Sequence, residues 1–284
     1  MAFLASLSTL DVHGHADGQR VLLGQLAYDA QRFSSSFQWS EQALAEGTEW
    51  SPIHLPLTAS RWSSSPKEFH LSGLPGLIHD ALPDGWGMLL MDRTLANGDP
   101  QVLGPLQRLA FLADRSWGAL EFSSSAGLSL AEPLQVSLKD LAIEARALSA
   151  GSAVSPSPAL LVGGSIPQGA RPKAMVGISA DCSEAWVGKE QLPQGYRHAL
   201  VKFAATWEDP MWLVLEYCYG EAARTLGIDT APAHLVQAGP EVGLVLDRFD
   251  RVKGEKQHVH SMAGILHTTH RIANSDWEQV AQVL

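Results

Sequence analysis

"RHALVKFAATWEDPMWLVLEYCYGEAARTLG" (197–227) joins a short apolar segment to a longer amphipathic one. Residues 197–205 predict a strand that carries Lys202 between Val201 and Phe203. A lysine within an apolar strand needs an anion or a route to water, because burying an unpaired charge is costly. Lys202 is therefore a candidate anion-binding residue, and a solvated lysine at a sheet edge is the alternative.

The second half of this stretch predicts a helix that begins after Asp209-Pro210 and ends at Gly227. Its apolar positions recur at a spacing of three or four residues: Trp212, Leu215, Tyr219, Ala222 and Leu226. Glu216 borders this stripe and can face inward. A lysine in a strand and a glutamate on the inner side of the next helix suit an ion pair. A solvated glutamate on the helix flank is the alternative.

The segment before this strand, "LLVGGSIPQGARPKAMVGIS" (160–179), is rich in glycine. We expect an apolar strand, a loop with Gly163, Gly164 and Gly169 followed by Lys173, and a second strand. Glycine-rich loops let backbone N–H groups wrap an anion such as a phosphate. The segment lacks the Lys-Ser/Thr pair that follows the second glycine of a P-loop, so an ordinary glycine-rich hairpin is the alternative.

The segment after the helix, residues 231–252, predicts a hairpin around Gly239-Pro240 and then a connector, Asp247 to Arg251. The chain order is thus glycine-rich loop, strand with lysine, helix with glutamate, hairpin and connector. This is the order of a protein-kinase N-lobe, in which the loop covers the ATP phosphates, the lysine holds them and the glutamate positions the lysine. The strand before the connector would offer backbone groups to the adenine.

The N-terminal part of the chain predicts short strands, turns and a few helices. Residues 20–29 predict a pair of strands around Gly24, residues 33–39 one strand, and residues 53–58 another. Clusters of Ser, Gly, Ala and Pro on both sides of an amphipathic helix in residues 124–160 predict a domain boundary.

"HDALPDGWGMLL" (79–90) keeps the large apolar ring of Trp86 among helix-breaking residues. We expect Trp86 to begin a helix that closes at Asn97-Gly98. Its ring would fold onto the following turn as a hydrophobic staple. The sequence therefore predicts a packing role for Trp86, not a chemical one.

Composition excludes several classes of protein. With 284 residues and 45% hydrophobic residues, the chain can bury a substantial core. A formal net charge of -10 argues against broad binding to nucleic-acid phosphates. Two cysteines, Cys182 and Cys218, cannot form a disulfide framework, and no apolar run approaches the ~18 residues of a membrane span. The start of the chain lacks the basic region of a signal peptide, so we expect a cytoplasmic protein.

Several motifs together carry a family resemblance. They are "GARPKA" (169–174), "VKF" (201–203), the helix "LEYCYGEAARTLGI" (215–228), "RFDR" (248–251), "GLIHDALPDGWGMLL" (76–90) and "DRSWGALEF" (114–122). In this order they resemble the HipA family of serine/threonine kinases, the toxins of bacterial toxin–antitoxin modules. The resemblance implies an α+β fold with a small mixed N-terminal domain (1–123), a linker with a helix (124–157) and a kinase-like N-lobe with the start of the C-terminal lobe (158–284). That N-lobe would be an antiparallel sheet with one main helix.

The resemblance also assigns site residues. Lys202 would contact phosphate, Gly169 and Ala170 would lie in the nucleotide-facing loop, and Asp247 and Phe249 match connector positions that contact the nucleotide. Glu216 is assigned from chain order. Members can autophosphorylate a serine just ahead of the Gly-Ala segment, and Ser165 is the nearest hydroxyl here, although Pro167-Gln168 departs from the small residues usual in the family loop.

A kinase also needs an Asp that orients the substrate hydroxyl, with an Asn and a second Asp for magnesium. "THRIANSD" (269–276) imitates that loop, but Ile272 stands at the Asp position. We therefore assign no catalytic residue to this chain. ATP and Mg²⁺ are the expected cofactors, the magnesium ligands are expected beyond Leu284, and the chain alone is expected to be inactive.

The resemblance implies partners as well: a small helix-turn-helix antitoxin of the HipB type, DNA only through that antitoxin, and no membrane. An aminoacyl-tRNA synthetase is a candidate protein substrate, because studied members of the family act on this class. A noncatalytic module that binds a nucleotide or an antitoxin is the alternative function.

Histidines cluster in two places. His258 and His260 lie on one face of a predicted extended segment, with His267 and His270 nearby, and "HGH" stands at 13–15. No cysteine or carboxylate at the usual zinc spacing joins them. The sequence therefore predicts solvated or hydrogen-bonded histidines and no metal site.

Overall fold

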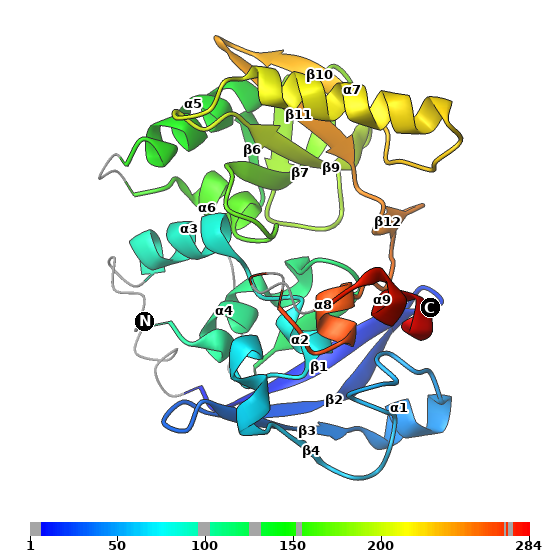
Figure 1. The fold of residues 1–284 in the computed structure, drawn as a ribbon. Coiled ribbons are helices and arrows are strands. Elements are labelled where there is room, and N and C mark those ends of the chain that lie inside the picture. Colours follow the sequence, from blue (N-terminus) through cyan, green and yellow to red (C-terminus); the bar gives the residue numbers. More distant parts are fainter. Residues whose placement is uncertain (1–6, 96–102, 125–131, 152–154, 270, 272–274) are drawn as a thin grey trace. The chain divides into compact units, whose positions relative to one another are not determined.

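The structure is a computed structural model, and it divides the chain into two units that each gather distant segments (Figure 1). Unit 1 comprises residues 1–82, 104–128 and 255–284, and unit 2 comprises residues 83–103 and 129–254. The described residues are 7–95, 103–124, 132–151, 155–269, 271 and 275–284. The predicted helix end Asn97-Gly98 and the position Ile272 lie outside them.

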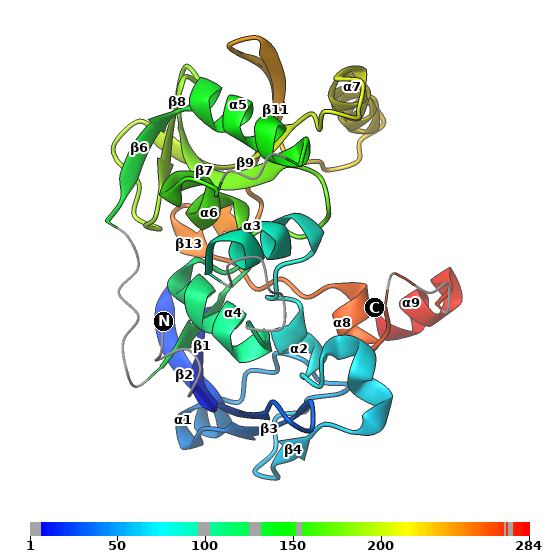
Figure 2. The ribbon, with the colours of Figure 1, turned by 90° about the vertical axis from the view of Figure 1, so that its left-hand side faces the viewer.

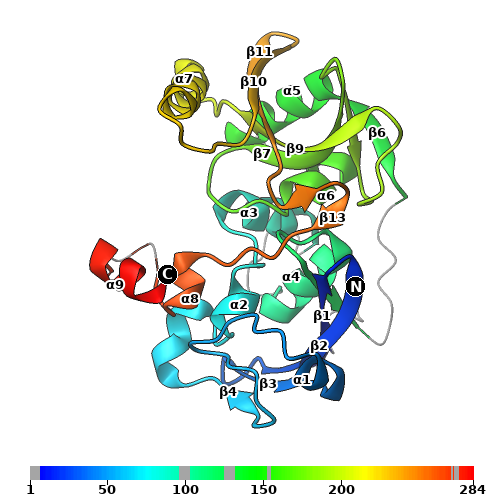
Figure 3. The ribbon, with the colours of Figure 1, turned by 90° about the vertical axis from the view of Figure 1, so that its right-hand side faces the viewer.

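Unit 1 is built on an antiparallel sheet with the strand order β4-β3-β2-β1-β5. Its strands are β1 (Thr9–Ala16), β2 (Gln19–Asp29), β3 (Ser34–Trp39), β4 (Trp62–Ser63) and β5 (Leu120–Ser123). Alternate side chains such as Leu10, Val12, Phe37 and Trp39 are buried, as expected of a sheet with one face on the core. Figure 3 shows strands β1 to β4 side by side.

Short helices complete unit 1. They are α1 (Glu41–Glu46), a 3-10 turn (Pro66–Leu71), α2 (Gly76–His79), α4 (Pro105–Leu112), a 3-10 turn (Ala113–Arg115), α8 (Met262–Ile265) and α9 (Trp277–Val283), with the short strand β13 (Glu255–Lys256).

The strand predicted at 33–39 is confirmed. The strand predicted at 53–58 is wrong: this segment is a turn whose Pro56 carbonyl accepts a hydrogen bond from Trp39 Nε1. The pair predicted around Gly24 is the single strand β2.

Unit 2 is built on a second antiparallel sheet, with the order β10-β11-β9-β7-β8-β6. Its strands are β6 (Leu134–Ser137), β7 (Lys173–Ser179), β8 (Glu184–Val187), β9 (Tyr196–Phe203), β10 (Ala233–Ala238) and β11 (Glu241–Asp247), with the short β12 (Arg251–Val252). Its helices are α3 (Gly85–Leu95), α5 (Leu138–Ser149), α6 (Pro158–Gly164) and α7 (Met211–Thr225). The α+β class and the antiparallel sheet with one long helix are as predicted.

The segment at 158–164 corrects the predicted strand, because it forms helix α6. The Ser157 side chain caps its first turn and Pro158 stands at N1, two start signals that outweigh the apolar run. Gly163 and Gly164 therefore lie in a helix, not in a loop. A Cβ at Gly164 would lie 2.5 Å from Leu90, so this glycine allows α6 to pack closely against α3 (Figure 2).

Helix α7 has the predicted extent but not the predicted orientation. The apolar stripe is exposed: Trp212 is 56%, Tyr219 75% and Leu226 79% exposed. Leu213 is the buried residue of the helix, and it packs with Tyr217 against Leu244 of β11. The spacing of apolar residues by three or four positions showed which residues share a face of α7. The packing of α7 against the neighbouring strands decides which face is buried.

The boundaries of the two units differ from the domain ranges expected from the sequence, 1–123, 124–157 and 158–284. The expected linker, 124–157, holds β6, which pairs with β8, and α5, which contacts β9, β10 and β11. Residues 83–103 belong to unit 2 and residues 255–284 to unit 1. Among the described residues, no helix combines the length and the apolar character needed to cross a membrane.

Candidate functional site

The predicted pair of Lys202 and Glu216 is formed. Lys202 Nζ, near the end of β9, donates a hydrogen bond to Glu216 Oε1 on α7. The two side chains are 25% and 37% exposed, so the pair is partly shielded and still reachable from solvent. Strand β9 fixes the position of the lysine, and α7 brings the carboxylate to it from 14 residues further along the chain.

Lys173 is a second lysine of this site, for which the sequence predicted no role. It is the first residue of β7 and lies directly opposite Lys202 in the antiparallel register, so both side chains leave the same face of the sheet. The Lys173 residue is 9% exposed, and its Nζ donates a hydrogen bond of 2.6 Å to the carbonyl of Gln168. Lys173 therefore contacts Gln168 on the other side of the glycine-rich loop and also lies beside Lys202 of β9.

The surroundings of Lys173 destabilise its charged form. Burial lowers the pKa of the Lys173 ammonium, and the charge of Lys202 lowers it further, to about 8. Asp84 and Glu216 oppose this shift, while Arg171 adds to it. Arg171 itself forms an ion pair of 2.7 Å with Glu208. An anion at this place would relieve the repulsion between the two lysines.

Gly169 lies in the loop before β7 with a φ of +93°. This left-handed backbone conformation favours glycine, and a Cβ here would also lie 2.5 Å from Lys173 Nζ. Ala170 follows in the same turn and contacts Gly85, where a Cβ would lie 3.1 Å from Ala170 Cα. The backbone of this loop at Gly169 therefore lies beside Lys173, which in turn lies opposite Lys202.

Ser165, the candidate for autophosphorylation, lies at the end of α6. It is fully buried, and its Oγ donates a hydrogen bond to the carbonyl of Leu161. A phosphate donor reaches this hydroxyl only if the turn after α6 opens.

Trp86 is buried as predicted, with 2% of its surface exposed. Its contacts go beyond its own helix. Its backbone N–H donates to the Gly169 carbonyl (3.0 Å), and its Nε1–H donates to the Lys173 carbonyl (2.9 Å). These contacts join residues more than eighty positions apart, so no local pattern in the sequence could have indicated them.

The connector residues lie apart from the two lysines. Asp247 is opposite Ala199 in the register, whereas Lys202 is opposite Leu244, so the side chains of Asp247 and Lys202 leave opposite faces of the sheet. Asp247 accepts a hydrogen bond of 2.8 Å from Arg197 Nε. Phe249 is 59% exposed.

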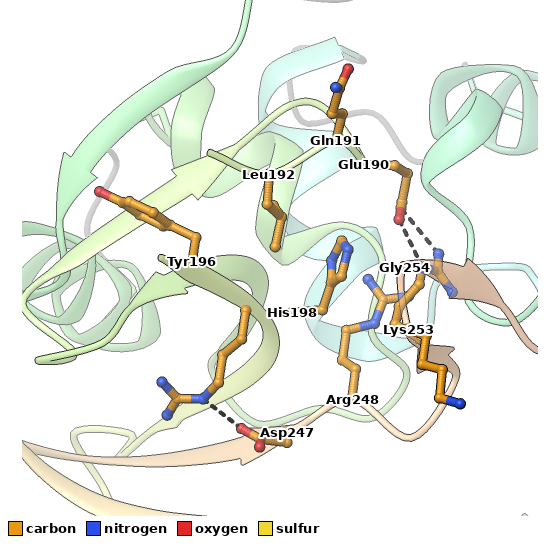
Figure 4. Close-up of a pocket in the computed structure, with 11 residues that line it drawn as sticks. Glu190, Gln191, Leu192, Tyr196, His198, Asp247, Arg248, Lys253 and Gly254 are labelled. Atoms are coloured by element: carbon orange, nitrogen blue, oxygen red, sulfur yellow. Dashed lines mark hydrogen bonds and ion pairs between the residues drawn. The ribbon is translucent and has the colours of Figure 1, made fainter. Parts of the chain in front are cut away.

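The "RFDR" motif has a structural role that its sequence did not indicate. Asp250 is fully buried between Arg248 and Arg251, with ion-pair distances of 2.7 and 2.8 Å. Arg251 also binds Glu190 at 2.7 Å. Arg248 and Arg251 line a cavity of about 620 Å³, together with His198 and Leu192. Figure 4 shows Arg248, His198 and Leu192 around this cavity. This buried network fixes the backbone of the connector, which a nucleotide would meet in a kinase.

Three histidines of unit 1, His258, His260 and His267, are hydrogen-bonded as predicted, whereas Nδ1 of His13 is buried without a hydrogen-bond partner in the described residue ranges. His258 Nε2 lies 3.0 Å from the Trp50 carbonyl, His260 Nδ1 lies 2.7 Å from Asp80 Oδ2, and His267 Nε2 accepts from the Gly76 N–H. Burial lowers the pKa of His258. In the part of the chain that the structure describes, no three His, Cys, Asp or Glu side chains could hold a metal ion; His270 lies outside it.

Ser51, His260 and Asp80 have the order of a serine hydrolase triad. Ser51 Oγ lies 3.0 Å from His260 Nε2, whose ring binds Asp80 through Nδ1. Ser51 is only 2% exposed, however, and Asp80 also accepts hydrogen bonds from the Ser261 N–H and hydroxyl. A nucleophile must reach its substrate, so this cluster is a buried network that holds the start of α8.

Comparisons with known proteins agree with the fold. The HipA N-terminal domain model matches residues 15–123, and the HipA-like C-terminal domain model matches residues 165–284. The fold resembles a chain in the structure of the Shewanella oneidensis MR-1 toxin–antitoxin system HipA, HipB and its operator DNA complex, with a TM-score of 0.58 and 15% identity over 92% of this chain. The present chain spans 57% of that chain. Comparison with the sequences of characterised proteins gave no match. Since the two domain models together match most of its length, the chain belongs to the HipA family.

Proposed function

We propose that this protein is a HipA-type serine/threonine protein kinase, the toxin of a bacterial toxin–antitoxin module, and that unit 2 binds ATP. The observation that carries the proposal is the ion pair between Lys202 of β9 and Glu216 of α7. A lysine on a central strand that is held by a glutamate of the neighbouring helix is the phosphate-binding arrangement of kinases. Family membership and the fold agree with it.

Each residue of the site has a role in this proposal. Lys202 binds phosphate oxygens, and Glu216 keeps its ammonium group in place. Lys173 adds a second positive charge, and Gly169 leaves space for a close approach to the backbone. Asp247 and Phe249 belong to the connector, which would lie beside the base of the nucleotide.

The described residues fit the phosphates of a nucleotide better than they fit magnesium. Two lysines and a glycine with positive φ surround the place for an anion. In the described part of the chain no cluster of carboxylates could hold a metal ion. Mg²⁺ would neutralise phosphate charge in a kinase reaction.

Lys202→Met in the 284-residue chain is the test of the proposal. The loss of a charge-assisted contact should weaken ATP binding by about 10- to 100-fold in calorimetry. Lys189→Met is the matched control, because Lys189 is an exposed lysine of the same unit. An unchanged ATP affinity in folded Lys202→Met, or no ATP binding by the unaltered chain, would contradict the proposal.

A noncatalytic nucleotide-binding or antitoxin-binding module is the second candidate, and one observation favours it. Residues 252–284 contain three acidic side chains, Glu255, Asp276 and Glu278. Asp276 caps α9 in a capping box, and its side chain accepts from the Gln279 N–H. We therefore expect ATP binding without phosphate transfer by this chain. Labelled phosphate on protein after incubation with γ-labelled ATP and Mg²⁺ would exclude this second function.

The proposed partner is a helix-turn-helix antitoxin of the HipB type. The structurally similar chain comes from a complex with HipB and operator DNA. A net charge of -10 supports contact with DNA only through such a partner. The family resemblance makes an aminoacyl-tRNA synthetase the candidate protein substrate, and a toxin with this target acts in the cytoplasm.

A further inference from the structure

Trp86 holds both ends of one short segment of the glycine-rich loop. Its backbone N–H donates to the Gly169 carbonyl at 3.0 Å, and its indole Nε1–H donates to the Lys173 carbonyl at 2.9 Å. Trp86 belongs to α3, which lies far from the loop in the sequence but within unit 2. Trp86 thus fixes the backbone of Gly169 and the backbone of Lys173 at the start of β7.

The glycines on both sides of Trp86 bring its turn close to the loop. A Cβ at Gly87 would lie 2.8 Å from the Ser165 carbonyl, and a Cβ at Gly85 would lie 3.1 Å from Ala170 Cα. On the other side, a Cβ at Gly164 of α6 would lie 3.1 Å from Trp86 Nε1. The contact between the "PDGWG" turn and the loop therefore depends on small residues on both sides.

A loop that binds an anion through its backbone loses conformational freedom when it binds. If other contacts already hold the loop in its binding conformation, less free energy is spent on ordering it and the affinity rises. The carbonyls of Gly169 and Lys173 both point to Trp86, while the Lys173 ammonium reaches back to the Gln168 carbonyl. The segment 169–173 is thus held from both sides.

We propose that Trp86 is a positioning residue for phosphate binding: its two N–H groups hold segment 169–173 so that Gly169 and Lys173 face the phosphates. This inference rests on the proposed ATP-binding function and extends it to a residue of the "LPDGWG" turn. The indole acts through the loop and does not touch the nucleotide.

Trp39 provides a matched control. It is buried, with 4% exposed, and its Nε1 donates a hydrogen bond of 3.0 Å to the Pro56 carbonyl. Trp39→Phe and Trp86→Phe therefore remove the same kind of bond, one in unit 1 and one beside the loop. Binding of ATP, inorganic tripolyphosphate and adenosine to the 284-residue chain and to both variants separates phosphate contacts from base contacts.

We expect Trp86→Phe to bind ATP and tripolyphosphate about 2- to 10-fold more weakly, which corresponds to the loss of one neutral hydrogen bond. Adenosine binding should not change, and amide exchange in residues 166–172 should be faster. Trp39→Phe should change none of these quantities. Equal effects of both variants, an equal loss for adenosine, or an unchanged phosphate affinity in Trp86→Phe would overturn the role of Trp86 while leaving ATP binding intact.

Gly85→Ala is a second variant, for the case that Trp86→Phe does not fold. The added methyl group would press on Ala170 and displace the turn without removing the indole, so it should also weaken tripolyphosphate binding. A folded Gly85→Ala with unchanged tripolyphosphate affinity would count against the inference. If the unaltered chain binds neither ATP nor tripolyphosphate, the proposed function fails and this inference fails with it.

Discussion

Two charge clusters of this protein surround their central charged group in different ways. In unit 1, Glu121 accepts hydrogen bonds from Arg20 and Lys256 and lies 2.7 Å from His15 Nε2. In unit 2, Lys173 lies opposite Lys202 and feels the charge of Arg171 as well. Each cluster has a buried charged group at its centre. The neighbours of Glu121 carry the opposite charge, whereas Lys173 lies beside a second lysine as well as near the carboxylates of Asp84 and Glu216.

The pKa values of the two central groups express this difference. Burial alone would raise the pKa of the Glu121 carboxyl, but the charge and the hydrogen bonds of Lys256, Arg20 and His15 lower it to about 2. Burial and Lys202 lower the pKa of Lys173 to about 8. In the first cluster the ionised form is stabilised, and in the second it is destabilised. The first arrangement stabilises the fold, whereas a buried group whose charged form is destabilised marks a candidate binding site.

Glu121→Gln should have the largest effect, because it breaks the cluster in unit 1. The Lys256 side chain is 7% exposed and would lose its carboxylate partner. We expect the free energy of unfolding at pH 7 to fall by about 2–3 kcal/mol in urea denaturation. Glu221→Gln is the control, since its pair with Arg224 is about 40% exposed and should change stability by less than about 0.5 kcal/mol.

The pH dependence sharpens this test. Because the pKa of Glu121 is lowered from 4.5 to about 2, its contribution is present above pH 4.5 and is lost as the pH falls toward 2. The difference in stability between the unaltered chain and Glu121→Gln should therefore shrink over that range. A constant difference between pH 7 and pH 3 would show that Glu121 is not held ionised by its neighbours.

Parts of this comparison could be predicted from the sequence. Lys202 and Glu216 lie in a strand and a helix that follow each other directly, so local signals were enough to predict their ion pair. Lys173 required the register of β7 with β9, and the contacts of Trp86 required the packing of α3 against α6. Neither arrangement leaves a periodic pattern in the chain.

Two wrong predictions, a strand in place of α6 and the buried face of α7, also have physical causes. The apolar run of α6 resembles a strand, and its cap at Ser157 and Pro158 decides for a helix. The stripe of α7 was identified correctly as one face, but the strands β10 and β11 cover the face with Leu213 and Tyr217. Burial depends on neighbours that are distant in sequence, and hydrophobic spacing carries no information about them.

Lys173→Met should have a smaller effect on stability than Glu121→Gln, and in the other direction. It removes a like charge from a buried position, so the free energy of unfolding at pH 7 should stay unchanged or rise by up to about 1 kcal/mol. Tripolyphosphate affinity should fall by about tenfold, because a charge-assisted contact is lost. A destabilised variant with unchanged anion affinity would make this cluster structural, like the one in unit 1.

Lys173→Arg should have the smallest effect, because it changes only how anion binding depends on pH. Lys173 is protonated in most molecules at pH 7, but with a pKa of about 8 it is largely neutral at pH 9. Tripolyphosphate affinity of the unaltered chain should therefore fall several-fold between these pH values, whereas an arginine stays charged throughout. Calorimetry at pH 8 in buffers of different ionisation enthalpy should show uptake of about half a proton per anion bound, because the anion favours the charged lysine. If Lys173→Arg keeps the same pH profile and the same proton uptake, Lys173 is not the group that titrates, and the two clusters do not differ in the way their charges suggest.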